Sequence, residues 1–100
     1  MQMAELNGKK SKRAIITVLG ADRVGIIAGV TGVLSRLGIN ILDISQTTMR
    51  NLFTMIMLVD MEKSDKPVKE IIEELESEGK KLNVEVRLQH EDIFNSMHRI

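Results

Sequence analysis

GADRVGIIAGVTGVLSRLGIN, residues 20–40, is the stretch that decides the fold. Residues 14–19 just before it form an apolar run with β-branched side chains, which predicts a strand leading into this stretch. Asp22 is a favourable N-cap for a helix, and Gly38 stands where a helix ends in a left-handed residue. Between them, apolar residues recur at helical spacing: Ile26, Val30, Val33, Leu34 and Leu37.

The turn from strand to helix is the place where the sequence predicts a ligand. A strand that runs through glycine into a helix N-terminus leaves backbone N–H groups without partners. Such an end favours an anion, for example the carboxylate of a small molecule.

The predicted helix contains Gly25, Gly29 and Gly32. Each interior glycine costs roughly 0.5–1 kcal/mol relative to alanine, so each needs a structural reason. We expect the helix to approach the sheet beneath it closely. We also expect Gly25 to keep the entrance of the turn free of side chains.

Composition limits the class of protein. The chain has 100 residues, 43% of them hydrophobic, which is typical of one folded domain. Lys+Arg and Asp+Glu are both 14, and this balance argues against a dedicated nucleic-acid binder. The chain has no cysteine, so we expect a reducing cytoplasm and no thiolate chemistry. No apolar run is long enough to span a bilayer, and the polar start is not a secretory signal.

The rest of the chain predicts three more strands and two more helices. Strands are expected at 40–48, 53–61 and 83–89, a helix from Ser64-Asp65-Lys66-Pro67 to about Leu82, and a short helix over 91–100. The strand at 53–61 is mostly apolar on both faces, so we expect a second subunit to cover one of them.

This order indicates an α+β fold. The pattern is the ferredoxin-like βαββαβ sandwich, an antiparallel four-stranded sheet with two helices on one face, plus the short C-terminal helix. We divide the chain into a mobile tail (1–12), the folded domain (13–90) and the C-terminal helix (91–100) packed on it.

Four motifs resemble the ACT domain, a small regulatory module that binds amino acids. They are Ile15-Thr17-Val18, Asp22-Arg23-Val24-Gly25-Ile26-Ile27, Leu37-Gly38-Ile39-Asn40-Ile41 and Ile44-Ser45-Gln46-Thr47. The resemblance covers about residues 14–89. It is strongest to free-standing single-ACT proteins, which are similar to half of the glycine cleavage repressor.

The resemblance implies a homodimer whose domains pair edge to edge through the strand starting near Asn40. An amino acid would sit between the turn of one subunit and that strand of its partner. N–H groups of residues 24–26 would hold its carboxylate, Asn40 would meet its polar groups, and Asp22 or Asp43 would attract its ammonium. The implied ligand-binding residues are Gly20, Asp22, Arg23, Val24, Gly25, Ile26, Asn40, Ile41 and Asp43. With no catalytic or DNA-binding domain fused to it, such a module would regulate by contacting a partner protein.

Three other functions stay open at this point. The first is a protein-interaction or assembly module that has lost its ligand. The second is an RNA-recognition motif, which stacks bases on aromatic residues, whereas here only Phe53 lies on a predicted strand. The third is an enzyme of the acylphosphatase kind, with Arg23 and Asn40 holding phosphate. Because Ser35 has no catalytic partner in view and cysteine is absent, we expect no enzyme and no catalytic residue.

Two remaining features have plain structural explanations. His90, Glu91, Asp92 and His98 do not have the spacing of a metal site, so we expect no metal and no cofactor. Met49, Met55, Met57 and Met61 form a stripe that marks either an adaptable binding surface or the core, and the core is the more frequent role.

Overall fold

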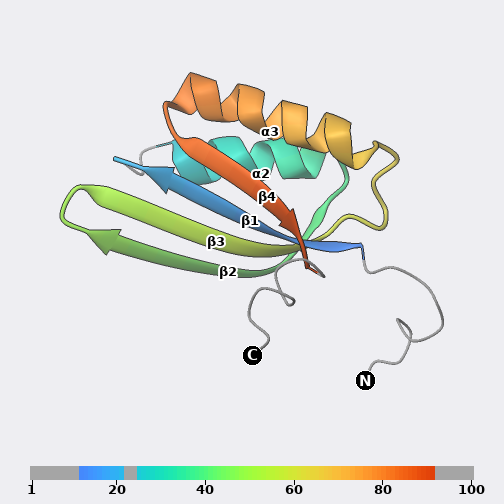
Figure 1. The fold of residues 1–100 in the computed structure, drawn as a ribbon, viewed down its shortest axis with the longest axis horizontal. Helices are drawn as coiled ribbons and strands as arrows, with labels where there is room; N and C mark the ends of the chain where they lie inside the picture. The colour runs from blue at the N-terminus through green and yellow to red at the C-terminus, as the bar shows by residue number, and fades with distance from the viewer. Residues whose placement is uncertain (1–11, 22–24, 92–100) are drawn as a thin grey trace.

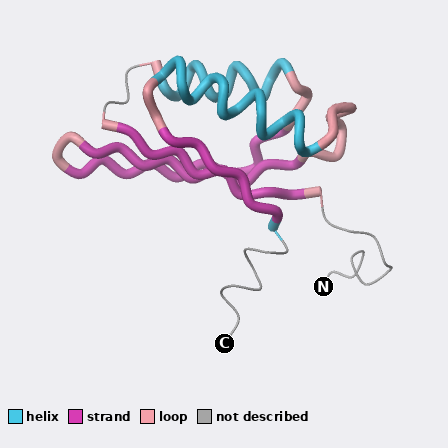
Figure 2. The backbone as a smooth tube through the Cα atoms, turned by 45° about the horizontal axis from the view of Figure 1, so that its top comes forward, coloured by secondary structure: helices cyan, strands magenta, loops and turns pink. Residues whose placement is uncertain are grey.

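A four-stranded antiparallel sheet carries two helices on one face (Figures 1 and 2). The computed structural model describes residues 12–21 and 25–91. Its elements are β1 (Arg13–Gly20), α2 (Ile26–Arg36), β2 (Asn40–Met49), β3 (Leu52–Asp60), α3 (Val68–Leu82) and β4 (Glu85–His90). The strand order is β2-β3-β1-β4, so β2 and β4 are the two edges. The ferredoxin-like prediction is confirmed, whereas the tail over 1–11 and the helix over 92–100 lie outside the described residues.

The core lies between the sheet and the helices. Strands β1 and β3 alternate in burial, and one face of each is closed to solvent. On that face lie Ile16, Val18, Phe53, Met55, Met57 and Val59. Because successive side chains of a strand point to opposite faces, every second residue of β1 and β3 points away from the helices.

Both helices are amphipathic. All five apolar residues predicted on the buried side of α2, from Ile26 to Leu37, are buried. Helical spacing predicts Val68, Ile71, Ile72 and Leu75 on the buried side of α3; Ile71 and Leu75 are buried, but Val68 is exposed, so this prediction is wrong for Val68. Val68 is the first helical residue, directly after the N-cap Pro67.

Left-handed residues set three of the helix ends. Gly38 has φ +74°, as predicted, and Asn83 has φ +60° at the end of α3. Because Asn83 belongs to this cap, the last strand begins at Glu85 and not at residue 83 as expected. Gly25 has φ +78° and is the N-cap of α2. The prediction of Asp22 as N-cap is therefore wrong: Asp22 precedes Gly25 by three positions and lies outside the described residues.

The helix glycines do not serve the predicted approach to the sheet. A Cβ on Gly29 would lie 2.7 Å from Cδ1 of Leu82 and 2.8 Å from Oε2 of Glu78, both on α3. Gly29 therefore allows α2 and α3 to pack closely against each other. A Cβ on Gly32 would meet no described atom within 4 Å, so packing within residues 12–21 and 25–91 does not explain that glycine.

Candidate functional site

The predicted ligand turn begins at Gly20, the last residue of β1. A Cβ at this position would lie 2.5 Å from Cγ1 of Val84, the residue before β4. Glycine is thus needed here for packing, with or without a ligand. Asp22, Arg23 and Val24, the centre of the predicted site, lie outside the described residues.

The N-terminus of α2 has the chemistry that an anion needs. Among the described residues, the first hydrogen bond of α2 runs from Gly29 N–H to Gly25 O at 2.9 Å. The N–H groups of Ile26, Ile27 and Ala28 therefore precede the first bond to a residue four positions earlier. The first turn of α2 holds no acidic side chain that would compensate the helix dipole.

Space at this helix end is open on the side of Gly25. Gly25 is exposed, and a Cβ on it would meet no atom of the described residues within 4 Å. Ile26, in contrast, is buried in the core, so it fixes the helix end against the sheet. The site residue Ile26 thus offers only its backbone N–H to a ligand.

The second half of the predicted site lies at the start of β2. Asn40 is exposed and opposite Asp60, and Ile41 is half-buried and opposite Val59. The register shifts by a β-bulge between Ile41 and Asp43. Asp43 is exposed, and its Oδ1 accepts a hydrogen bond from the N–H of Ile44 at 2.9 Å.

Within one chain, the two halves of the site lie at opposite ends of the sheet. Gly20 is opposite Phe53 on β3, whereas Asn40 is opposite Asp60. Seven residues of extended strand separate these two positions, a distance of roughly 23 Å. A single copy therefore does not bring Asn40 to the turn after Gly20, and a phosphate held by both would be out of reach.

Strand β2 is an open edge. All of its residues from Leu42 to Met49 are exposed, and Figure 1 shows β2 (green) at the side of the sheet away from α3. Leu42 is 47% exposed and Ile44 is 37% exposed. An edge with free backbone groups and apolar side chains is suited to pairing with another strand.

The described residues contain neither an exposed aromatic side chain on the sheet nor a cluster of three metal-binding side chains. Phe53 is only 1% exposed and points to the helices, so it cannot stack on a base. In residues 12–21 and 25–91 no three metal-binding side chains gather. Met55, Met57 and Met61 are core residues, as the sequence favours, and only Met49 of the stripe is exposed.

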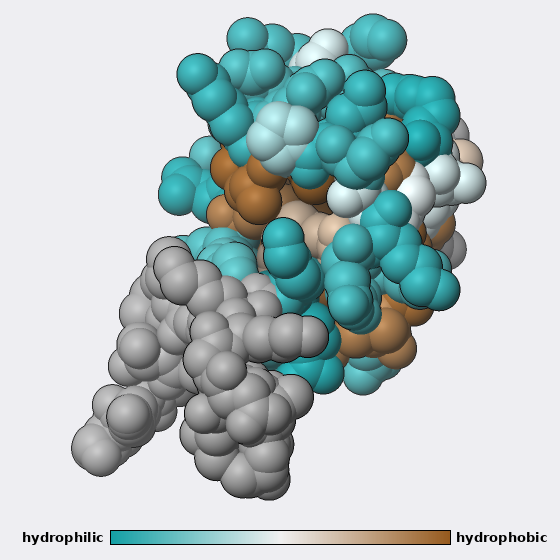
Figure 3. Space-filling model, turned by 90° about the vertical axis from the view of Figure 1, so that its right-hand side faces the viewer, coloured by the Kyte–Doolittle hydropathy of each residue, from teal (hydrophilic) through white to brown (hydrophobic). Residues whose placement is uncertain are grey.

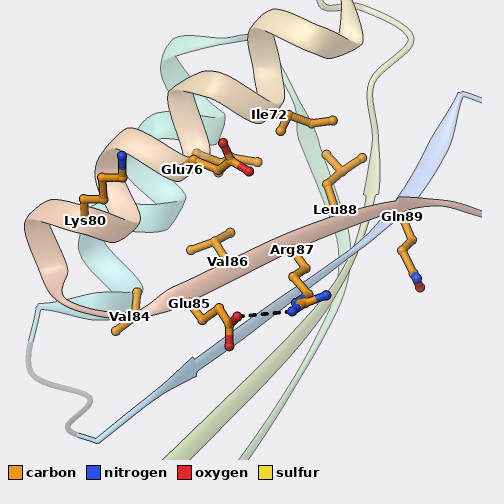
Figure 4. Close-up of a pocket in the computed structure, with 10 residues that line it drawn as sticks. Ile72, Glu76, Lys80, Val84, Glu85, Val86, Arg87, Leu88 and Gln89 are labelled. Carbon is orange, nitrogen blue, oxygen red and sulfur yellow. Dashed lines mark hydrogen bonds and ion pairs between the residues drawn. The ribbon is translucent and has the colours of Figure 1, made fainter.

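One feature that sequence reasoning missed is an open groove of about 620 Å³ between α3 and β4 (Figure 4). Figure 3 shows apolar surface recessed beneath the hydrophilic surface of the helical layer. Apolar side chains from both elements line the groove: Ile72, Leu75, Val84, Val86 and Leu88. The alternation in β4 is visible in the sequence, but its place at a sheet edge follows only from the strand order.

Comparison with known proteins decides the family. The family model described as "ACT domain" matches residues 12–89. The chain belongs to the ACT domain family. It is 51% identical over 88 residues to a UPF0237 protein of Methanopyrus kandleri, covering 88% of this chain and 98% of that protein.

Solved structures agree with this assignment. An ACT domain protein from Streptococcus pneumoniae has a TM-score of 0.75 and 42% identity, covering 84% of this ACT domain chain and 94% of that chain. A putative glycine cleavage system transcriptional repressor has a TM-score of 0.71. With 18% identity it shows a common fold alone, over 81% of this chain and 47% of the repressor. The expected likeness to half of that repressor is confirmed.

ACT domains are regulatory modules that commonly dimerise and bind small ligands. In the described part of this chain, neither helix combines the length and the apolar composition that a membrane crossing requires.

Proposed function

We propose that this ACT domain is a non-enzymatic regulator that binds a free amino acid at a seam between two copies. The observation that carries the proposal is strand direction. Both β1 and β2 run antiparallel to β3, so they are parallel to each other. The turn after β1 therefore lies at the end of the sheet where β2 stops, far from Asn40 of its own chain.

A two-fold axis beside β2 resolves this separation. If β2 pairs antiparallel with β2 of a second copy, the partner's strand starts where this copy's strand ends. The start of the partner's β2 then lies at the same end of the joined sheet as Gly25. Each dimer has two such places, and each is built from the turn of one copy and β2 of the other.

The chemistry on the two sides of the seam suits an amino acid. The α2 N-terminus offers N–H groups to a carboxylate, and its first turn contributes no competing acid. The partner's Asp43 offers an exposed carboxylate to an ammonium, while Asn40 can both donate and accept hydrogen bonds. The proposed site comprises Gly20, Asp22, Arg23, Val24, Gly25 and Ile26 from one copy and Asn40, Ile41 and Asp43 from the other.

Thermal unfolding in the presence of each common amino acid tests this function. A ligand at 100 times its Kd adds about 2.7 kcal/mol per site to the free energy of unfolding. For a domain of this size, that raises Tm by roughly 10 °C or more. We expect one amino acid, or a few of similar shape, to give such a shift.

Two matched variants locate the site. Asp43→Asn removes the charge but keeps an oxygen that accepts the Ile44 N–H, so it should fold normally and lose most of the Tm shift. Glu62→Gln removes a charge from an exposed loop residue outside the proposed site and should keep the shift. A shift that persists in Asp43→Asn would contradict this role of Asp43.

The alternative function, an assembly module without a ligand, makes a different prediction. It predicts flat melting curves for every amino acid in a protein that still forms dimers through β2. A protein that is monomeric at micromolar concentration would contradict both functions, because each requires the β2 seam.

A further inference from the structure

The second edge of the sheet, β4, has an unusual combination of features. In the described part of the chain β4 pairs only with β1, so one side of its backbone is open. It contains no proline and no bulge, which are devices that protect sheet edges. The open side borders the groove beneath α3, which is long enough to include residues from Val84 to Gln89.

The two faces of β4 differ in chemistry. Val86 is opposite the buried Val18, and Leu88 is opposite the buried Ile16, so both lie on the helix side. Glu85 and Arg87 lie on the other face, and Figure 4 shows them directed away from α3. Their carboxylate and guanidinium groups are 3.2 Å apart and largely exposed.

This arrangement is complementary to itself. In an antiparallel pair, residues opposite each other lie on the same face of the sheet, whereas neighbouring residues of one strand lie on opposite faces. A two-fold axis between two copies of β4 must therefore pass at one residue, which is then opposite the same residue of the second copy. An axis at Val86 places Glu85 opposite Arg87 of the second copy, and this contact occurs twice. On the helix side, the same register places Val86 opposite Val86 of the second copy. It also places Val84 opposite Leu88 of the second copy.

Neighbouring registers lack this match. An axis at Arg87 places two guanidinium groups opposite each other. An axis at Leu88 places Arg87 opposite Gln89. Opposite charges across strands stabilise a pair and like charges destabilise it, so the charges of β4 select the axis at Val86.

We propose that β4 pairs with β4 of a second copy about a two-fold axis at Val86, which extends the sheet and closes the groove beneath α3. This seam is independent of the amino-acid site and of the β2 seam, because β2 and β4 are opposite edges. Together the two seams give assemblies larger than a dimer. The β4 seam alone gives a dimer.

Charge reversal followed by mixing tests the proposal. Glu85→Arg and Arg87→Glu each place like charges opposite each other twice. Each variant alone should therefore dissociate at this seam, with the dissociation constant raised roughly 10-fold or more. A mixture of the two variants places arginines of one copy opposite glutamates of the other, and it should recover the wild-type mass in light scattering.

The mixing step separates this seam from a role within one chain. In each single variant, residues 85 and 87 of the same chain carry like charges. They repel each other whether or not the two variants are mixed. Only contact between copies explains a recovery. Lys69→Glu and Glu73→Arg, on the exposed side of α3, are the matched controls and should keep the wild-type mass.

Hydrogen exchange of the wild-type protein gives a second measurement that needs no variant. The N–H groups of β4 that face away from β1 should exchange slowly at high protein concentration and faster on dilution. Unchanged masses for both single variants, or exchange in β4 that does not depend on concentration, would overturn the β4 seam. Neither result would affect the β2 seam, which melting and mass measurements at β2 variants test separately.

Discussion

At the scale of single residues, glycines in the two helices have different neighbours. Gly32 in α2 is exposed, and in the part of the chain that the structure describes a Cβ there would meet nothing within 4 Å. Gly79 in α3 is buried, and a Cβ there would lie 3.0 Å from the carbonyl oxygen of Val84 and 3.0 Å from Cγ2 of Val86. The Val84 backbone is itself fixed, because its N–H donates to Gly79 O at 2.9 Å.

Alanine substitution should therefore act in opposite directions at these two glycines. Gly32→Ala should raise the free energy of unfolding by about 0.5–1 kcal/mol, because alanine is the better helix former and nothing opposes it. Gly79→Ala should lower it by about 1 kcal/mol, because the added methyl group overpacks the contact with β4. Urea unfolding of both variants measures the difference, and equal stabilisation by both would show that β4 yields to the methyl group.

At the scale of elements, the sequence predicts all four strands and both helices of the described part. Helical spacing and strand alternation are local signals, so they place the elements to within a few residues. The sequence does not predict the N-cap at Gly25, because N-caps are recognised by a side chain that accepts a backbone hydrogen bond. Gly25 has a positive φ and no such side-chain bond. The partner of Gly29 was missed because helix–helix contact depends on the tertiary arrangement.

The sequence predicts only part of the candidate site for a similar reason. The glycine turn and Asn40 are recognisable as motifs, but nothing local shows that they lie at opposite ends of one copy. That separation follows from the parallel directions of β1 and β2. The groove beneath α3 also depends on strand order, so alternation in β4 alone did not reveal it.

The exposed apolar side chains of β2 allow a test of the proposed β2 seam at the level of one strand. Ile44 is opposite the buried Met57, so it points to the helix side, and it is 37% exposed there. Ile44→Lys should weaken the proposed β2 seam by placing a charge between the two copies. Ile56→Lys is the matched control, because Ile56 is 45% exposed on the opposite face of β3.

Sedimentation across a range of concentrations measures both variants. We expect Ile44→Lys to raise the dissociation constant at β2 roughly 10-fold or more, which corresponds to about 1.4 kcal/mol. Ile56→Lys should sediment as the wild-type protein does. If both lysines dissociate the protein equally, the outer face of the sheet takes part in assembly and the β2 seam is not its sole basis.

At the scale of the whole molecule, the proposed ligand site and the β2 seam are thermodynamically coupled. In the proposed arrangement one copy holds only half of the site, so the ligand should bind the dimer better than the monomer. By linkage, the factor by which dimerisation strengthens ligand binding equals the factor by which ligand strengthens dimerisation. A regulatory domain of this size can thus convert the concentration of a metabolite into a change of assembly, without moving any element of its own fold.

This coupling gives a quantitative prediction. For the amino acid that raises Tm most, the dimer dissociation constant measured by sedimentation should fall steadily as its concentration rises above Kd. In Ile44→Lys, where the seam is weakened, the same amino acid should bind with a higher apparent Kd and should partly restore the dimer. A ligand that stabilises Ile44→Lys dissociated at β2 as strongly as it stabilises the wild-type protein would contradict a shared site. It would place the whole binding site within one copy, where the helix N-terminus after Gly25 would have to act without the partner's Asn40 and Asp43.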